Sequence, residues 1–549
     1  MTIVAPILLV LVLALPLALA LAAPFVARPL NLLAWAALPG LVAALTLAPG
    51  TVVDVPVVVL GLSLAVDGAG RIFLGAGALL WLIAGIYARD YMAGSPRPRE
   101  FSACWLVTLA GTLGTFIAAD IVTFYMSFSL MSLAAYALVV HDREPAAWRA
   151  GRIYIILAVV GETALLGGFI ISAAAADSLA ITQVQAALPD SPWRNWALAG
   201  FLVGFGMKAG LVPLHVWLPI AHPQAPTPAS AVLSGVIVNA GIIGLLRFVP
   251  FDGGAWSLSL VVLGLVTTFY GALAGLAQSN TKALLAYSTL SQMGVLVTVI
   301  GTAEATSAVS LYAAHHGLAK GALFLGIGVV AASGQRSLRW ILPVVGLMAL
   351  AIAGLPLTGG ALAKLAIKDL LGDNTAATLV TVSAVTTALL MLRFIYLEAT
   401  APRDGAGTPP LGLILPWAAT VVAALVLPWV LFPVLTDHPA AYPLTPENLW
   451  AGLWPILVAL AVAALALIVK LPAVTLPQGD LVVIAEAAAR RIRLACTATA
   501  ETARALRLPQ ISSTLPGRLV SGIEQRSEQW TVVGPALLIL AVLIGLALL

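Results

Sequence analysis

Charged residues are scarce in this chain: they make up 9% of its 549 residues, against about 25% in an ordinary soluble protein. Hydrophobic residues make up 61% of the sequence. The length could accommodate several soluble domains, but no polar stretch is long enough to form one. This composition excludes a soluble globular protein and predicts an integral membrane protein.

Cysteine is scarce as well. Cys104 and Cys496 are the only two, which is too few for a disulfide framework or a zinc-type cluster. The arginines are scattered through short loops, so the net charge of +4 gives no basic surface for nucleic acid. No ligand set for a quinone, flavin, haem, iron–sulfur cluster or other metal is visible, and we expect no cofactor. The first 25 residues lack a basic segment, so we interpret them as a span and not as a cleaved signal peptide.

Apolar windows of about 20 residues predict a series of membrane spans. Sixteen of them begin near residues 3, 30, 72, 102, 119, 152, 196, 226, 256, 283, 305, 339, 374, 411, 448 and 531. If the N-terminus lies outside, most loop arginines are cytoplasmic, while the outer loops hold Arg71, Arg194 and most loop acids. The positive-inside rule is satisfied for this orientation only. We expect a multi-pass protein of the bacterial inner (cytoplasmic) membrane, in contact with lipid.

One apolar run, residues 204–223, contains a lysine and a break. Lys208 is followed at once by Gly-Leu-Val-Pro, and then by His215, His222 and further prolines. A charged group inside a membrane costs free energy and marks an ion pathway, and a broken helix is tolerated only beside protein or a wet cavity. The alternative is a lysine that extends to the membrane surface. Lys208 lies about twelve residues inside its segment, which is too deep for that.

Lysine and arginine are distributed differently along the chain. The arginines lie mainly at span ends and in loops, whereas five of the six lysines fall between residues 200 and 370: Lys208, Lys282, Lys320, Lys364 and Lys368. Arginine keeps its proton in proteins, while a buried lysine can lose it. The pattern favours proton exchange at the lysines. Glu162 is the one carboxylate deep inside a span of the first half.

The second half carries a similar group of residues. His316 and Lys320 are four residues apart and share one helix face, with His315 beside them. Lys364 and Lys368 repeat that spacing after a second Gly- and Pro-containing break. Each residue alone could be a buried polar group that only fixes helix packing, but the whole series indicates an ion path. The breaks at 204–223 and 354–368 suggest two copies of one unit, as in transporters with inverted repeats.

The C-terminal part has a different composition. Residues 471–530 hold seven arginines and four glutamates. Within them, 480–507 combines apolar residues at helical spacing with charged ones, which predicts an amphipathic helix. It lies either on lipid headgroups or along a neighbouring subunit, and the sequence leaves both open. The apolar run 531–549 would form the last span.

Four motifs in sequence order carry a family resemblance. They are GMKAGLVPLHVWLPIAHPQAPTPASAVLSG, AQSNTKALLAYSTLSQMG, HHGLAKGALFLGIG and GLPLTGGALAK, within residues 102–400. They resemble the antiporter-like subunits of respiratory complex I, of multisubunit cation/proton antiporters and of hydrogenase-4-type complexes, and the tail resembles the hydrogenase-type branch most.

The resemblance implies an all-α polytopic membrane protein with about 16 transmembrane helices, two inverted five-helix repeats with broken helices, a C-terminal lateral helix and a final span. The implied parts are N-terminal helices (1–101), a first repeat (102–250), a second repeat (256–398), C-terminal helices (411–470) and the amphipathic helix with the terminal helix (471–549).

The resemblance also assigns roles. Lys208 matches the central lysine of the first broken helix, and Lys364 matches the lysine that gates exit to the outside. His316 and Lys320 match the histidine and connecting lysine of the second repeat, and Glu162 falls where some members carry an acid. His215, His222, Lys282, Lys368 and His315 are further candidates for the same path.

Three positions depart from the family pattern. The usual fifth-span glutamate should fall near Ser129, the eighth-span relay residue is Asn239, and the acid before the Lys282 motif is Asn280. Neither serine nor asparagine changes charge near neutral pH. These departures leave open whether the first half-channel is active, and whether Glu162 is the partner of Lys208.

The leading interpretation is an ion-translocating subunit of a larger redox-driven or antiporter complex, which moves protons, or protons in exchange for Na⁺. It would have no redox centre of its own, and whether the complex is an enzyme stays open. One alternative is a membrane partner that energises an inorganic-carbon-hydrating subunit. Another is a scaffold that has lost the path. Other membrane subunits are expected as partners in each case.

Overall fold

The computed structural model describes residues 4–56, 61–250, 252–401, 407–470, 474–483 and 486. Fifteen helical segments in this part are long and apolar enough to cross a membrane, by length and composition. They match the first fifteen predicted spans, and the largest difference is between the predicted start near 152 and the observed start at Pro145. The predicted span 531–549 lies outside the described residues. The chain is an all-α polytopic membrane protein, as predicted.

The N-terminal half of the bundle begins with helices α1 (Val4–Ala22), α2 (Leu38–Thr46), α3 (Gly68–Tyr91), α4 (Pro98–Ile117), α5 (Ile121–Val139), α6 (Pro145–Ala176) and α7 (Ile181–Ala187). Strands β1 (Thr51–Asp54) and β2 (Ser63–Val66) form an antiparallel hairpin in which Thr51 faces Val66. N-cap residues fix where several helices begin. The Asp67 side chain accepts a hydrogen bond from the Gly70 amide at the start of α3, and the Asp120 side chain accepts one from the Thr123 amide at the start of α5.

The remaining helices are α8 (Arg194–Ala209), α9 (Trp217–Gln224), α10 (Thr227–Val232), α11 (Asn239–Phe248), α12 (Ala255–Leu276), α13 (Thr281–Thr302), α14 (Thr306–Ala331), α15 (Gln335–Ala353), α16 (Gly359–Leu371), α17 (Thr375–Thr400), α18 (Leu411–Leu435) and α19 (Pro446–Ile468). Short 3₁₀ turns lie at Ala23–Phe25, Pro29–Leu32, Trp35–Ala37, Leu188–Asp190, Leu214–Val216 and Tyr442–Leu444. A π-helical turn, Leu233–Ile237, joins α10 to α11.

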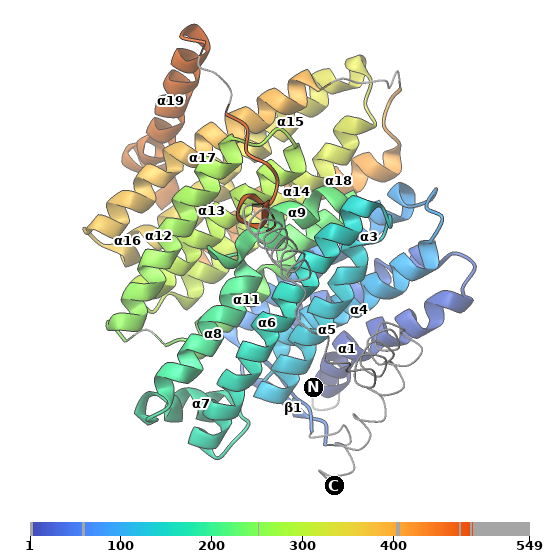
Figure 1. Ribbon diagram of the computed structural model, residues 1–549, viewed down its shortest axis with the longest axis vertical. Coiled ribbons are helices and arrows are strands. Elements are labelled where there is room, and N and C mark those ends of the chain that lie inside the picture. The colour runs from blue at the N-terminus through green and yellow to red at the C-terminus, as the bar shows by residue number, and fades with distance from the viewer. Residues whose placement is uncertain are drawn as a thin grey trace, which may run out of the picture. The chain divides into compact units, whose positions relative to one another are not determined.

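Burial separates a central pair of helices from a peripheral set. The most apolar window of α13 is completely buried within the chain, and that of α14 is 94% buried, whereas the α19 window is only 17% buried. Figure 1 shows α13 and α14 in the middle of the bundle, with α1 and α19 at its edges. In a membrane, helices such as α19 face lipid or other subunits. Polar side chains are therefore expected on the buried helices, such as α13 and α14, where other protein groups can satisfy them.

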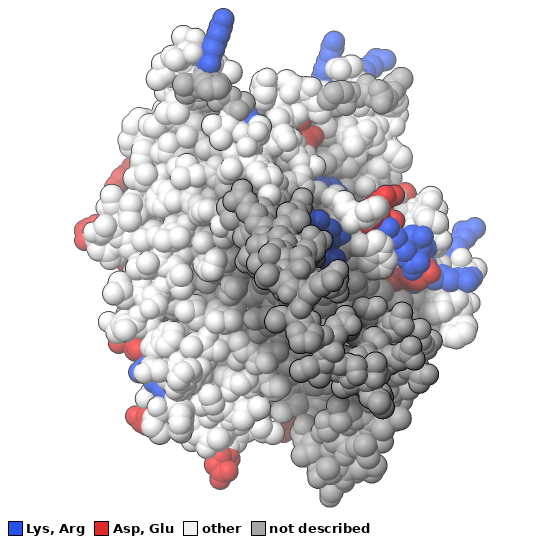
Figure 2. Space-filling view, in the orientation of Figure 1, with Lys and Arg blue, Asp and Glu red and all other residues white. Residues whose placement is uncertain are grey.

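Charged side chains are sparse on the visible surface. In Figure 2 most of the described surface carries neither Lys or Arg nor Asp or Glu. Most of the basic groups lie at the top and right of that view, and many of the acidic groups lie along its left and lower edges. The uncharged band between them is the surface expected for lipid contact.

Helices α6 and α8 pack unusually closely because glycines line their contact. A Cβ atom at Gly204 would lie 2.6 Å from the Gly161 carbonyl oxygen, and one at Gly200 would lie 2.5 Å from the Ala164 carbonyl oxygen. Small residues allow such an approach between membrane helices. The contact brings Glu162, next to Gly161, beside the last turn of α8.

Both predicted helix breaks are confirmed. Gly210 ends α8 with φ +80°, and Gly354 ends α15 with φ +96°. Glycine adopts this left-handed conformation without the strain that a Cβ atom introduces. The chain then continues through η5 (Leu214–Val216) into α9 at the first break, and through the short turn 355–358 into α16 at the second. Two interrupted spans therefore cross the bundle.

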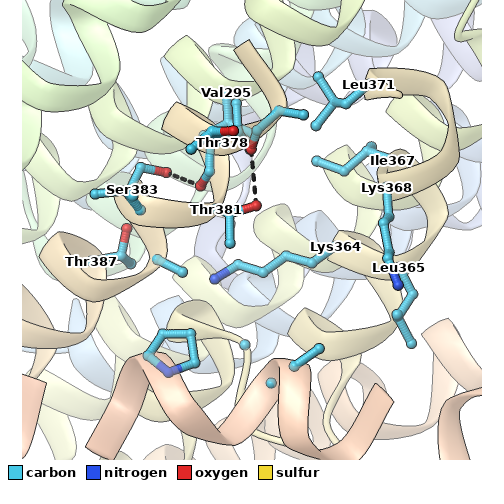
Figure 3. A pocket seen from close by; sticks show the side chains of 18 of the residues that line it. Val295, Lys364, Leu365, Ile367, Lys368, Leu371, Thr378, Thr381, Ser383 and Thr387 are labelled. Carbon is cyan, nitrogen blue, oxygen red and sulfur yellow. Dashed lines mark hydrogen bonds between the residues drawn. The ribbon is translucent and has the colours of Figure 1, made fainter. Parts of the chain in front are cut away.

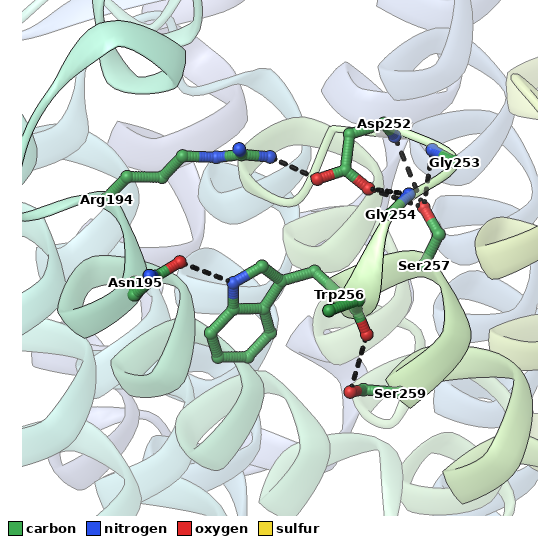
Figure 4. Close-up of polar contacts among 9 residues, drawn as sticks. Arg194, Asn195, Asp252, Gly253, Gly254, Trp256, Ser257 and Ser259 are labelled. Atoms are coloured by element: carbon green, nitrogen blue, oxygen red, sulfur yellow. Dashed lines mark hydrogen bonds and ion pairs between the residues drawn. The ribbon is translucent and has the colours of Figure 1, made fainter.

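Polar contacts fasten the start of α8 to the loop before α12, as Figure 4 shows. Arg194 forms an ion pair with Asp252, and Trp256 Nε1 donates to Asn195 Oδ1 at 2.8 Å. Burial alone would raise the pKa of Asp252, but hydrogen bonds from Gly254 and Ser257 and the Arg194 guanidinium hold it below its usual value. The first broken span is thereby tied to the second half of the bundle at one end.

Candidate functional site

Lys208 lies in the last turn of α8 and is completely buried. Its Nζ atom donates to Ser132 Oγ of α5 and to Tyr154 Oη of α6, the latter at 3.4 Å. Three rings surround the ammonium group: Nζ lies 5.3 Å from the ring centre of Phe128, 5.4 Å from that of Tyr154 and 5.8 Å from that of Trp217. Aromatic faces attract a cation at these distances. The site is built to hold a positive charge away from water.

Glu162 is a carboxylate within electrostatic range of this lysine. Its side chain is buried on α6 and interacts electrostatically with Lys208. Its Oε1 atom makes no hydrogen bond within the part of the chain that the structure describes. A buried carboxylate with an open acceptor position can gain a proton more readily than one whose oxygens are both satisfied.

Helix α5 meets Lys208 through Ser132, three residues after Ser129. Both Ser129 and Ser132 interact with the Glu162 side chain, and Ser132 also accepts Tyr154 Oη on its carbonyl oxygen at 2.8 Å. The departure at Ser129 could be recognised in the sequence, but the contacts of Ser132 and Tyr154 with Lys208 could not. Residues three apart lie on the same helix face, so the spacing alone could not decide which serine meets the lysine.

The first broken span continues toward α14. His222 of α9 stacks on Phe324 of α14 with ring centroids 4.7 Å apart, and interacts electrostatically with Lys282 and Lys320. Neither ring nitrogen of His222 is hydrogen-bonded within the described ranges. Lys282 Nζ donates to the Ala225 carbonyl oxygen at 2.8 Å, directly after α9. His222 therefore lies within electrostatic range of the next two lysines in the sequence, Lys282 and Lys320.

Helix α14 carries three polar side chains on one face: Tyr312, His316 and Lys320, each four residues from the next. All three are buried. Lys320 Nζ donates to the Leu285 carbonyl oxygen of α13 at 3.1 Å, and Tyr312 Oη donates to Gln292 Oε1 of α13 at 2.6 Å. The predicted pair His316 and Lys320 is thus part of a longer polar row where the deeply buried helices α13 and α14 meet.

His315 faces the second helix break. A Cβ atom at Gly359 would lie 2.5 Å from His315 Nδ1, and one at Gly360 would lie 3.2 Å from His315 Nε2. The imidazole therefore lies directly against the start of α16, where only glycine leaves room for it. His315 also interacts electrostatically with Lys364. The two neighbouring histidines face different groups, His315 the break and His316 the lysine of its own helix.

Lys364 lies beside the second helix break and also lines a cavity. Its Nζ atom donates to the Ala353 carbonyl oxygen at the end of α15, where the helix dipole favours a cation. The residue also lines a cavity of about 1010 Å³ between α13, α14, α16, α17 and α19. Figure 3 shows the Lys364 side chain extending across this cavity toward Thr381 and Thr387.

The cavity is polar along one wall and reaches the protein surface. Thr378, Thr381, Ser383 and Thr387 of α17 line it, together with Gln292 and Tyr312 from its inner end. Its outer lining includes the exposed residues Lys368, Gly372, Asp373 and Asn374. Hydroxyl and amide groups of this kind can hold water, and the cavity connects Lys364 with the surface.

Two further predicted residues, Lys368 and His215, and the family departure Asn239 have other surroundings. Lys368 is exposed, and its Nζ atom lies 3.7 Å from Glu447 Oε1 in a surface ion pair. Asn239 Nδ2 donates to the Gly235 carbonyl oxygen at 3.0 Å and to that of Ala313 at 3.5 Å, which braces the π-helical turn against α14. His215 lies in η5 and its Nε2 atom is 3.4 Å from Asp480 Oδ2. Asp480 and Gln292 were not singled out from the sequence.

The described residues therefore define a class of protein: a polytopic membrane protein with two interrupted spans and buried titratable side chains between them. Glu162 and Lys208 lie at one break, His315 and Lys364 at the other, with His222 and a polar row on α14 among the residues between them. Within the same part of the chain, no three His, Cys, Asp or Glu side chains gather closely enough to hold a metal ion.

Comparison with known proteins gives the family. Residues 118–390 match the family model described as NADH:quinone oxidoreductase/Mrp antiporter, transmembrane. An uncharacterised protein of Mycobacterium tuberculosis (strain ATCC 25618 / H37Rv) is 32% identical over 329 residues, covering 55% of this chain and 51% of the relative. Hydrogenase-4 component B of Escherichia coli (strain K12) is 31% identical over 300 residues, covering 49% and 43%. The chain spans about half the length of the curated relatives it matches.

A solved structure, the Mrp complex from Dietzia sp. DQ12-45-1b, contains a chain with the same fold. Its TM-score is 0.74 at 24% sequence identity, and the match covers 94% of this chain and 62% of that chain. Through residues 118–390, this protein belongs to the NADH:quinone oxidoreductase/Mrp antiporter family. The resemblance carried by its four motifs is thereby confirmed.

Proposed function

We propose that this chain is an ion-translocating subunit of a multisubunit membrane complex and moves protons, or protons in exchange for Na⁺, along its buried titratable groups. The observation that carries the proposal is the position of Lys364. A lysine that lies at a helix break, within electrostatic range of the buried His315, and that lines a cavity of about 1010 Å³ reaching the surface, is equipped to exchange protons with water.

Lys208 and Glu162 supply the charge pair at the other end of the path. A proton on either group changes the electrostatic interaction between them, and the buried setting makes that change strong. We assign them the role of an upstream element, whose charge state biases the groups on α9 and α14. His316, Lys320 and Lys364 then form the route that ends at the cavity.

The same proposal fixes orientation and location. With the N-terminus outside, the cavity beside Gly372 and Asn374 opens to the outside, and the ends of α9 and α12 face the cytoplasm. The separation of acidic from basic groups in Figure 2 supports this orientation. We place the chain in a bacterial inner membrane, with 102–250 and 256–398 as the two inverted repeats.

The names of the related proteins support partner subunits. One relative is a hydrogenase component, and the similar solved chain is part of an Mrp complex. Only 17% of the most apolar window of α19 is buried within the chain. The exposed apolar surface of this helix is available for contact with a neighbouring subunit. We therefore expect the chain to work with other membrane subunits and not alone.

Purification of the native complex, followed by transport measurements in sealed vesicles, tests the function. Mass spectrometry identifies the partner subunits, and a pH-sensitive dye reports proton movement under an imposed pH gradient, with and without Na⁺. Wild type should move protons, and a Lys208→Ala/Lys364→Met double variant should not. A double variant that assembles and transports at the wild-type rate would show that the chain is a scaffold.

A further inference from the structure

A polar cluster outside the lysine series surrounds Asp480, which follows the last described span. Three donors from three elements meet at its Oδ2 atom: Tyr270 Oη of α12 at 2.5 Å, Tyr287 Oη of α13 at 2.8 Å and His215 Nε2 of η5 at 3.4 Å. Its Oδ1 atom accepts the Leu481 amide at 2.5 Å. No part of the proposed path uses this carboxylate.

The chain around Asp480 is held in place by its backbone. The Leu476 amide donates to the Ala277 carbonyl oxygen at 3.0 Å, and Gln278 Nε2 donates to the Leu476 carbonyl oxygen at 3.3 Å. Both partners lie directly after α12. These contacts bring Asp480 against the ends of α12 and α13, where its side chain is 8% exposed. An aspartate that only caps the start of a surface helix would not need this burial.

The cluster keeps Asp480 ionised. Burial alone would raise the pKa of the carboxyl group, but hydrogen bonds from His215 and Tyr270 outweigh it and hold the pKa at about 2. Asp480 is therefore a fixed negative charge at every physiological pH. It stabilises its neighbours without itself gaining or losing a proton.

His215 links this charge to the first helix break. It is completely buried in the short turn that joins α8 to α9, and its ring lies edge-on against Tyr270 with centroids 5.0 Å apart. While Nε2 faces Asp480, Nδ1 makes no hydrogen bond within the described residues. A carboxylate at one ring nitrogen fixes the orientation and tautomer of an imidazole and leaves the other nitrogen available.

We propose that Asp480 is a positioning residue of the ion path: it orients His215 and places a fixed negative charge beside the break between α8 and α9. The carboxylate comes from a segment far away in the sequence and compensates for the scarcity of acids in the first half, where Glu162 is the deep carboxylate. This inference rests on the proposed function, because it gives Asp480 a part in the same path.

Four variants of the full complex in sealed vesicles test the inference: Asp480→Asn, Asp480→Glu, His215→Gln and the Asp480→Asn/His215→Gln double. Asp480→Asn should slow proton transport about tenfold, the loss typical when the group that orients a functional histidine is removed. Asp480→Glu should keep much of the wild-type transport rate, because it retains the carboxylate. The double variant should be no slower than His215→Gln alone, because Asp480 acts through His215. Asp437→Asn, the same change at an exposed site, should keep the wild-type rate.

Rates are compared per assembled complex, so that a loss of assembly is not counted as a loss of transport. Asp480→Asn at the wild-type rate, or a double variant whose losses add, would leave Asp480 as a docking contact only and overturn the inference. A Lys208→Ala complex run alongside separates the two claims. If Lys208→Ala is inactive while Asp480→Asn is not, the proposed function stands without this inference; if Lys208→Ala transports normally, both fall.

Discussion

Lys208 illustrates the balance of free energies at a single residue. A charged lysine at the centre of a membrane helix costs about 3 kcal/mol on insertion scales. The three rings around its Nζ atom each lie within 6 Å, and such contacts contribute about 0.5–1 kcal/mol each at the least. The cost and the compensation are of similar size, so the charge on Glu162 is enough to decide whether Lys208 holds its proton.

Lys208→Ala should abolish coupled ion movement and leave assembly intact, because the side chain is replaced without altering the break at Gly210. We expect a drop of about a hundredfold in transport rate, as for the loss of a proton-transfer group. The measurement is dye-reported proton flux in sealed vesicles, beside the amount of complex recovered. An exposed lysine, Lys470, gives the matched control, and Lys470→Ala should keep its flux.

Asn239→Ala should have little effect on transport. Its amide braces the π-helical turn through Gly235 and Ala313, and it cannot change charge near neutral pH. The free energy of unfolding of the purified complex should fall by about 1 kcal/mol, because these hydrogen bonds are lost. Flux that collapses in Asn239→Ala would show that the route passes through the first half, contrary to the assignment.

The sequence could predict the identities of the path residues but not all of their partners. Lys208, His316, Lys320 and Lys364 stand out because charge is rare in an apolar chain. Ser132 and Tyr154 do not, because serine and tyrosine occur throughout membrane helices without any such role. The role of Asp480 could not be predicted for another reason. Its hydrogen bonds join residues more than 190 positions apart, and no local sequence pattern predicts such a contact.

At the scale of elements, the close contact of α6 with α8 sets the geometry of the charge pair. Gly161, Gly200 and Gly204 permit an approach in which any Cβ atom would overlap a backbone carbonyl or a neighbouring side chain. The helix boundaries followed from the sequence to within a few residues, since Gly, Pro and N-cap residues act locally. The glycine contact did not, because it depends on which two helices become neighbours.

Gly204→Leu should push α6 away from α8 and separate Glu162 from Lys208. Overpacking of this kind typically costs about 1–3 kcal/mol of stability. We expect a lower melting temperature and a large loss of flux, although every titratable residue is retained. Gly167→Leu on the neighbouring helix α6 is the control, since a Cβ atom there meets nothing within 4 Å. Equal flux in both glycine variants would contradict the role given to this contact.

For the whole molecule, the composition was sufficient to predict the class of fold, and the four motifs were sufficient to predict the family. The amphipathic character of 480–507 predicted a lateral helix, of which residues 480–483 are helical and most of the rest lies outside the described residues. That this helix lies along a neighbouring subunit, and not on lipid headgroups, therefore stays a prediction.

Deletion of 482–549 should weaken assembly with partner subunits while leaving the described path residues unchanged. The truncation keeps Asp480, so the cluster at His215 is retained. Co-purification of partner subunits with the tagged chain, quantified by mass spectrometry, measures the effect. Undiminished recovery of every partner would show that the basic segment contacts lipid only.

The most direct test of the ion path compares two lysines of one helix, Lys364 and Lys368, by proton flux in sealed vesicles. Lys364 lines the cavity at the helix break, while Lys368, one turn away, lies at the exposed outer end of the cavity and is paired with Glu447. Lys364→Met should stop proton flux as completely as Lys208→Ala, and Lys368→Met should leave it near the wild-type rate. Normal flux in assembled Lys364→Met complex would contradict the proposed route through the second half of the chain.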